Sequence, residues 1–519
     1  MRILLLQDKA KSVITFFVLL LTLNSGLATA QYNGNYWCFG DSSFINWSDP
    51  QNPVIGSASF YYRNGCSTIG DSNGLIAYAG RLDNILPNNC CVWNKSHQII
   101  NGSDHIFGAA WYHSSLFIPD PGNDSIIYLF TSGVTNNPYG FYYSTINYKA
   151  NNDSGIVIQK NVQLNNFPAF DALMAVRHGN GRDWWVIFQR WFPPAGAQTS
   201  NTFYLYLISE SGLNGPFMQS IGSSHSTNLG HLIFSNSGNN FAQVSIRGMI
   251  ELYNFDRCSG TITSTIPIET ETAAAPYPHW YSSCAFSPDD SKLYVADYSQ
   301  TNSPSYLWQY DLLSANIIAS KSLIDSFVDP DMGIAQLRLA PDNKIYLSAS
   351  DEGFPWPYPD TITAYTTINN NLSVINYPDS LGAACDFQPF SFNLGTGRSY
   401  YGLPNNPDYE LGAWVGSPCD TLSVGVQHPE PTEKLEPFLQ AWYNHEWDMI
   451  HVNASKLQGK KGVLRLVDIE GRVVFEKPSD IISGGYFTTE IYTNEISDGV
   501  YIVNLVTDKE TLSFKVGKL

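Results

Sequence analysis

Between residues 60 and 395 the apolar positions fall in short runs separated by turn residues. The clearest unit is CAFSPDDSKLYVA at 284–296, in which two apolar runs flank a Pro-Asp turn, and LRLAPDNKIYLS at 337–348 repeats this order about 53 residues later. More divergent copies begin near residues 231, 175, 116 and 66. Short apolar runs around turns of this kind predict antiparallel β-hairpins.

Two further strands are expected between successive hairpins, for example at 306–312 and 317–324. Four strands per unit, repeated at roughly 40–50 residues, predict a β-propeller, because each four-stranded blade is apolar on both faces and must stack on its neighbours. A pair of β-sandwiches does not explain the constant spacing. Six copies are visible. We expect a seventh blade built from 372–376 and 383–392 and completed by the N-terminal strand at 36–39, with six blades as the alternative.

Residues 462–519 carry a different pattern. Two apolar strands surround the turn at 469–472, the turn Ser497-Asp498-Gly499 leads into Val-Tyr-Ile-Val, and a last strand at 511–516 ends near Lys518. Such strands with Gly-containing turns predict a small immunoglobulin-like antiparallel β-sandwich. Their order and the terminal lysine resemble the C-terminal sorting domain of the type IX secretion system. The resemblance implies that the secretion machinery is a partner; an ordinary immunoglobulin-like module is the alternative.

The N-terminus has the features of a secretory signal peptide. Lys9 and Lys11 precede an apolar stretch at 13–23, and Ala28-Thr29-Ala30 fits a cleavage site. The apolar stretch is too short for a bilayer-spanning helix. We therefore expect a chain that does not span a membrane and is secreted or held at the outer surface of a diderm bacterium. The expected order is signal peptide 1–30, propeller 31–406, linker 407–435 and sorting domain 436–519.

The charge balance restricts the class of partner. The formal net charge is −18 and only 14% of the residues are charged. A nucleic-acid-binding protein needs a basic face to displace counterions, so nucleic acid is excluded as a partner.

Several segments of the predicted propeller carry a second resemblance. They are 35–40, 65–74, 92–102, 175–186, 381–387 and 402–405. These segments look like a family of secreted β-propellers that bear type IX sorting domains and are related to lactonase-like and WD-type propellers. This resemblance implies a fold and a location, and it implies no particular reaction.

The sequence contains no nucleophile elbow, HExxH motif, phosphate-binding loop or dinucleotide fingerprint. We therefore expect no cofactor, no metal and no catalytic residue. Three groups of charged residues were weighed. We interpret His445, Glu446 and His451 as surface residues, and Arg177, His178 and Asp183 as a hairpin turn. We expect Arg247 and Arg338 at inner-strand positions, and Asp297, Asp351 and Glu352 at the ends of second strands.

Those last five residues could form a polar site in the central channel. The alternative is a water-filled channel with paired charges. Aromatic residues in the loops are a separate candidate, because their ring faces could stack on sugars; the alternative is that they pack between blades. They are Trp111, Trp191, Trp280, Trp356 and Tyr358.

The eight cysteines all follow the signal peptide, and in an exported protein disulfides are expected. Connectivity cannot be read from sequence. The pairs considered are Cys38–Cys66, Cys258–Cys284 and Cys385–Cys419, with Cys90 and Cys91 vicinally bonded or free.

Three functions fit these observations. The preferred one is a non-catalytic binding or adhesion module for a glycan or a protein partner. The alternatives are a lactonase-like or glycan-cleaving hydrolase with its site in the channel, and a passive element of the cell envelope. An enzyme of this kind should bring carboxylates or histidines together from several blades. Few such residues are found on the expected inner strands, which favours the binding module.

Overall fold

The computed structural model describes residues 32–62, 65–81, 89–108, 113, 115–133, 140–192, 198–272, 278–298, 304–328, 333–350, 366–420, 437–444, 448–455, 457, 461–480, 487–494 and 496–518. Within these ranges the chain is almost entirely β-structure. Helical turns are short: α2 (Ala150–Asp153), η1 (Ile318–Ser320) and η2 (Gly382–Cys385).

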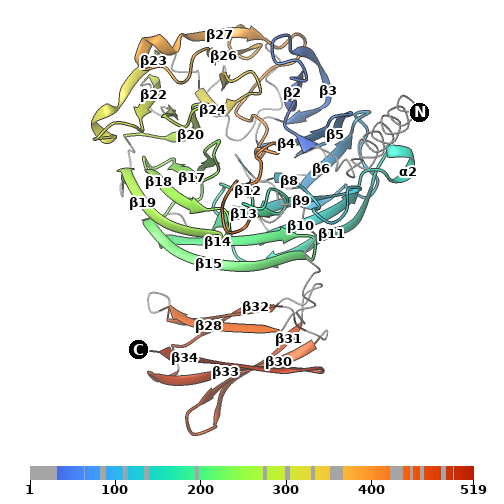
Figure 1. Cartoon of the computed structure of the whole chain (residues 1–519), viewed down its shortest axis with the longest axis vertical. Helices are drawn as coiled ribbons and strands as arrows, with labels where there is room; N and C mark the ends of the chain where they lie inside the picture. The colour runs from blue at the N-terminus through green and yellow to red at the C-terminus, as the bar shows by residue number, and fades with distance from the viewer. Residues whose placement is uncertain are drawn as a thin grey trace, which may run out of the picture.

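Six antiparallel sheets of four or five strands form a ring, which is a β-propeller (Figure 1). Blade 1 contains β1 (Tyr32–Asn33), β4 (Ser67–Asp71), β5 (Gly74–Arg81), β6 (Asn89–Asn94) and β7 (Ile106–Phe107), and blade 2 contains β8 (Ser115–Pro119), β9 (Ile126–Gly133), β10 (Gly140–Asn147) and β11 (Ile156–Asn165). Blade 3 contains β12 (Met174–Arg177), β13 (Trp184–Gln189), β14 (Ser200–Ser209) and β15 (Gly212–His225), and blade 4 contains β16 (Gly230–Phe234), β17 (Asn240–Ser245), β18 (Ile250–Asp256) and β19 (Thr261–Glu269). Blade 5 contains β20 (Tyr281–Phe286), β21 (Lys292–Asp297), β22 (Ser305–Asp311) and β23 (Ser322–Phe327), and blade 6 contains β24 (Gly333–Leu339), β25 (Ile345–Ser350), β26 (Asn371–Ile375) and β27 (Phe387–Asn393).

The predicted hairpins are confirmed, and three blades form them with the same local hydrogen bonds. In blade 5 the N–H of Asp290 donates to Ser287 O, and in blade 6 the N–H of Asn343 donates to Ala340 O. Gly238 does the same with Ser235 in blade 4. All three turn residues have positive φ, at 60°, 61° and 71°. Asp, Asn and Gly are the residues that tolerate this conformation, so the repeated turn follows from the repeated sequence.

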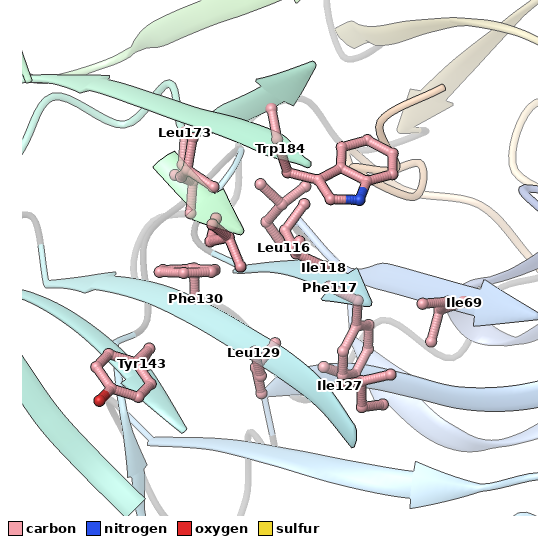
Figure 2. Packing of buried hydrophobic residues seen from close by; sticks show 14 of the residues in the cluster. Ile69, Leu116, Phe117, Ile118, Ile127, Leu129, Phe130, Tyr143, Leu173 and Trp184 are labelled. Carbon is pink, nitrogen blue, oxygen red and sulfur yellow. The ribbon is translucent and has the colours of Figure 1, made fainter. Parts of the chain in front are cut away.

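Apolar side chains between the blades hold the ring together. Ile69 of β4, Phe117 of β8 and Leu129 of β9 belong to one buried cluster with Trp184 of β13 (Figure 2). This cluster spans three blades. Large aromatic residues supply much of the buried surface, and each contributes on the order of 1.5–3 kcal/mol when it is removed from water.

The predicted closure of the ring is wrong. Residues 372–376 and 383–392 do not begin a seventh blade, because β26 pairs with β25 and β27 pairs with β26 to complete blade 6. The segment at 36–39 lies in another sheet, where β2 (Tyr36–Asn46) pairs with β3 (Val54–Tyr62). The long connection from Ser350 to Asn371 interrupts the regular spacing, so the second half of blade 6 looks like a separate unit in the sequence.

Within the described ranges the β2–β3 hairpin takes the place of a seventh blade, between blade 6 and blade 1 (Figure 1). Trp47 of the hairpin lies 5.1 Å from the ring of Tyr346 and 5.7 Å from that of Phe392, both in blade 6. The hairpin is also bonded to the chain that follows blade 6. Arg398 donates from Nε to Asp41 Oδ2 over 2.7 Å, and the two backbones exchange hydrogen bonds.

The C-terminal residues form the predicted antiparallel sandwich. One sheet contains β28 (Phe438–Asn444), β29 (Met449–Ser455) and β32 (Phe487–Tyr492), and the other contains β30 (Lys461–Asp468), β31 (Val473–Asp480), β33 (Gly499–Thr507) and β34 (Thr511–Lys518). Its core is separate from the propeller clusters and draws on both sheets, including Ile450, Leu464 and Val503.

Lys518 is fixed at the end of β34. Its Nζ donates to the carbonyls of Thr493 and Ile496 over 2.8 Å each and lies 2.8 Å from Asp448 Oδ1. The hydrogen bond from Lys518, followed by those from Thr493 and Tyr443, lowers the pKa of Asp448 to about 2. The lysine therefore ties the last strand to the loops of the three-stranded sheet.

Candidate functional site

Residues 399–414, which we call the channel segment, fill the centre of the propeller. The segment follows blade 6 and crosses the middle of the ring as an orange stretch in Figure 1. Leu403, Asn405, Asn406 and Tyr409 are all buried. Leu403 N–H donates to the side chain of Gln336 on β24 over 2.6 Å, so the segment begins against blade 6.

Two asparagines and a tyrosine bond the channel segment to the inner strands of other blades. Asn405 Nδ2 donates to Ser115 O over 3.1 Å and to Leu173 O over 2.8 Å. The amide of Asn406 accepts from the N–H of Thr68 and donates to its hydroxyl, each over 2.8 Å. Tyr409 OH donates to Phe117 O over 2.9 Å. Backbone groups that would otherwise face an open channel are thereby satisfied.

Three arginines bind carbonyl groups spaced three residues apart along the segment. Arg338 of β24 donates to Asn406 O, Arg177 of β12 donates to Tyr409 O, and Arg257 donates to Gly412 O. None of the three forms an ion pair within the part of the chain that the structure describes. Burial lowers the pKa of Arg338 to about 10, and burial followed by repulsion from Arg177 does the same for Arg257.

A disulfide fixes the chain where it leaves the propeller. Cys258, after β18, is bonded to Cys419, and Trp414 N–H donates to Gly179 O over 2.8 Å. Residues 407–420, which fall within the predicted linker, are therefore held against blades 3 and 4. This bond makes the predicted pairs Cys258–Cys284 and Cys385–Cys419 wrong, because each requires a partner that is already used.

The remaining cysteines have free thiols. They are Cys38, Cys66, Cys90, Cys91, Cys284 and Cys385, and all are buried. The predicted Cys38–Cys66 pair is therefore wrong as well. The two thiols lie near each other: burial raises the pKa of Cys38, and Cys66 adds to this effect. Cys90 and Cys91 were predicted to be either bonded to each other or free, and in the structure they are free. Burial disfavours the thiolate form, so these thiols stay protonated.

A cavity of about 460 Å³ opens at one end of the channel. Its floor is formed by Asn406 to Leu411 of the channel segment, and its walls are the ends of the inner strands β12, β16, β20 and β24. Asn35 and Ser48 of the N-terminal region complete the rim. Arg338 is half-buried in this wall.

Of the expected polar site, Arg247, Asp297 and Arg338 lie in the described residues, and Arg247 and Asp297 serve local contacts. Arg247 lies in the turn after β17 rather than on an inner strand, and its Nη1 pairs with Glu271 over 3.3 Å. Asp297 ends β21 as expected and accepts from His279 Nδ1 over 2.7 Å. Asp351 and Glu352 lie outside the described residues.

The interpretation of the second charged group as a hairpin turn is confirmed. The N–H of His178 donates to Asp183 O over 2.8 Å, and the Asn180 amide donates to the carboxylate of Asp183 over 2.9 Å. The interpretation of His445, Glu446 and His451 as surface residues is not tested, because His445 and Glu446 lie outside the described residues, as does the side chain of His451.

Two of the five candidate aromatic residues, Trp191 and Trp280, lie in the described residues. Trp191 is 6% exposed, and its Nε1 donates to Ser226 O over 3.3 Å, so it offers little ring surface to a ligand. Trp280 is half-buried and meets Tyr298 edge to face. Trp111, Trp356 and Tyr358 lie outside the described residues. Sugar stacking by this set stays a prediction.

Sequence reasoning missed two histidines at the middle of the ring. The rings of His113 and His231 stack with centroids 4.0 Å apart. His231 Nδ1 accepts from the N–H of Cys284 over 2.9 Å, and burial lowers the pKa of His113 to about 3. Both imidazoles are therefore neutral and serve packing. The Gly402-Leu403-Pro404-Asn405 motif was the one signal in the sequence that pointed to this region.

The chain is therefore a β-propeller with a filled central channel, followed by a β-sandwich. The solved structures it resembles include a protein from Lactobacillus plantarum, with 10% identity over 72% of this chain and 98% of that chain and a TM-score of 0.41. The Dos1 propeller has 11% identity over 72% and 87%, with a TM-score of 0.38. PorZ, an essential surface component of the type IX secretion system of Porphyromonas gingivalis, has 11% identity over 94% and 74%, with a TM-score of 0.25. Such distant likenesses concern the fold alone. No protein-family model and no curated protein sequence matches this chain.

Two further observations apply to the described ranges. No three His, Cys, Asp or Glu side chains gather there in a way that could hold a metal ion. No helix there combines the length and the apolar character that crossing a bilayer requires.

Proposed function

We propose that the protein is a non-catalytic binding module for an extracellular glycan or surface protein, exported through the type IX secretion system. The observation that supports a non-catalytic binding function is that the channel segment fills the central channel. Propeller enzymes can use the central channel as a site where groups from several blades meet. Here the polar groups of β4, β8, β12 and β24 bond to the channel segment instead.

Among the described residues, one concave surface is the cavity at the end of the channel. Its lining comes from inner strands, which are the rigid part of a propeller, and a rigid lining costs little ordering entropy when a ligand binds. Ligand pockets in proteins usually measure roughly 300–1,000 Å³, and this cavity of about 460 Å³ falls within that range.

A binding and turnover screen of the whole purified chain tests this function. We expect retention of at least one extracellular polysaccharide or surface protein and no turnover of ester, lactone or glycoside substrates. Turnover that disappears in Asp297→Asn would replace the binding function with a hydrolase function.

Export is tested by removing the C-terminal sandwich. Deleting residues 437–519 should leave a folded propeller, because the two parts have separate cores and the Cys258–Cys419 disulfide lies outside the deletion. We expect the truncated protein to accumulate in the periplasm, measured by cell fractionation and immunoblotting. Normal amounts outside the cell would contradict the sorting role. A Tyr377→Phe variant of the full chain, altered at an exposed position, serves as the control for unchanged export.

A further inference from the structure

The outer face of the four-stranded sheet of the sandwich carries an apolar patch at one end. Core residues such as Leu466 and Val503 alternate along β30 and β33 with side chains that point outward. The strand register places these outward residues side by side, because β30 pairs with β31 on one side and with β33 on the other. We call the following five residues the sandwich patch: Val467, Ile469, Val473, Val500 and Ile502.

The sandwich patch is open to solvent. Ile469 is 79% exposed, Val473 52% and Ile502 39%. The outer face of an antiparallel sheet that meets water is normally polar, so contiguous exposed apolar side chains indicate a contact surface. The propeller does not cover this face. It lies against the other sheet, where β29 contacts β15 of blade 3, and Figure 1 shows β30 and β33 on the far side of the sandwich.

The distribution of charge favours a second copy of the chain as the occupant. Residues 437–519 contain eleven acidic and nine basic residues, whereas the whole chain has a formal net charge of −18. Nearly all of the negative charge therefore lies outside the sandwich. Two copies that meet through their sandwiches keep their acidic parts apart, and so they avoid most of the repulsion between like-charged molecules.

The rim of the sandwich patch is complementary to itself. Lys515 of β34 lies opposite Ile502 at one side of the sheet and forms no ion pair within the described residues. Glu476 of β31 lies at the other side, half exposed beside Arg465. A two-fold axis parallel to the strands would place β34 of one copy over β31 of the other, so that Lys515 approaches Glu476. A lipid surface would instead favour a rim of cations alone.

We propose that the sandwich patch packs on the same patch of a second copy and forms a two-fold symmetric dimer. This inference goes beyond the proposed binding function and does not depend on it. A dimer of this kind presents two propellers on one particle, which raises the avidity for a ligand that repeats along a polysaccharide or across a cell surface.

Analytical ultracentrifugation of the whole chain over a series of concentrations tests the dimer. We expect reversible association with a Kd on the order of 10–100 µM, because five side chains form a smaller interface than a stable dimer has. Ile502→Glu should weaken association at least about 10-fold, since dimerisation would then bury an unpaired carboxylate. Lys515→Glu should also weaken it. Thr511→Glu makes the same charge change as Ile502→Glu at an exposed position at the other end of β34, and it should have no effect.

Ile469→Glu keeps the test decisive if Ile502→Glu does not fold. Ile469 lies in the turn between β30 and β31 and is mostly exposed, so a carboxylate there leaves the core unchanged. It should weaken association at least about 10-fold as well.

A monomer at every concentration, or a dimer that persists in both Ile502→Glu and Ile469→Glu, would overturn the inference. If the wild-type chain is monomeric and Ile502→Glu blocks export while Thr511→Glu does not, the sandwich patch belongs to a contact with the secretion machinery and self-association is wrong. Failure of the proposed binding function is separate. It would appear as the absence of every glycan and protein partner in the binding screen, whatever the sedimentation of the chain.

Discussion

Asp41→Ala is expected to destabilise the propeller by about 3–5 kcal/mol. Asp41 and Arg398 are almost fully buried, and their closest N–O distance is 2.6 Å. Removing the carboxylate deletes this buried ion pair at the point where the N-terminal hairpin joins the chain after blade 6. Urea unfolding followed by tryptophan fluorescence measures the effect, since Trp37 and Trp47 lie in the same closure.

An exposed ion pair provides the control. Lys95 and Asp153 lie 2.9 Å apart with about half of each side chain exposed to solvent. Asp153→Ala should therefore change stability by at most about 1 kcal/mol. If Asp41→Ala has no larger effect than Asp153→Ala, the buried pair does not hold the ring closed. The Asp41→Ala, Arg398→Ala double variant should lose less than the sum of the single variants.

Cys258→Ser should lower the free energy of unfolding by about 2–5 kcal/mol. The disulfide joins residues separated by 161 positions and restricts the unfolded chain accordingly. Denaturant unfolding measures the loss. Dithiothreitol provides the control, because it should destabilise the wild-type protein by a similar amount and leave Cys258→Ser unchanged. Equal stability of the variant and the oxidised wild type would show that the bond contributes nothing.

Gly179 gives an independent check on the same bond. A Cβ at this position would lie 2.4 Å from Cys419 Sγ and 2.8 Å from Cys258 Sγ, which is too close for atoms that are not bonded. Gly179→Ala should therefore displace the disulfide. Gly412→Ala, whose Cβ would meet nothing within 4 Å, should be neutral.

The blades could be predicted because their signals are local. The left-handed turn residues Asp290 and Asn343 lie within a few positions of the strands they join, and each hairpin repeats the same order of residues. The sandwich was predicted on similar grounds, from turns such as the one before β33. Local turn chemistry and apolar periodicity survive in sequence even where the copies have diverged.

The closure could not be predicted, because it depends on contacts between distant parts of the chain. Asp41 and Arg398 are separated by 357 positions, and no periodic pattern links them. The connection between β25 and β26 also hides which strands belong to blade 6.

The channel segment escaped prediction for a different reason. Asn405 and Asn406 read as loop residues, since polar residues next to proline are typical of exposed turns. Their side chains bond to backbone groups that only the folded ring brings together. The same holds for Cys258 and Cys419, because any even set of cysteines allows many pairings.

The position of the disulfide affects how the protein bears mechanical load. Cys419 lies at the C-terminal end of the propeller part of the chain. Residues 421–436 connect it to the C-terminal sandwich. Tension applied through that sandwich, as by shear on a surface-held molecule, reaches the covalent bond to Cys258 first and passes into blade 4. The hydrogen bonds of Asn405, Asn406 and Tyr409 lie beyond this junction and carry little of the force. A pulled molecule should therefore retain its filled channel until blade 4 itself unravels.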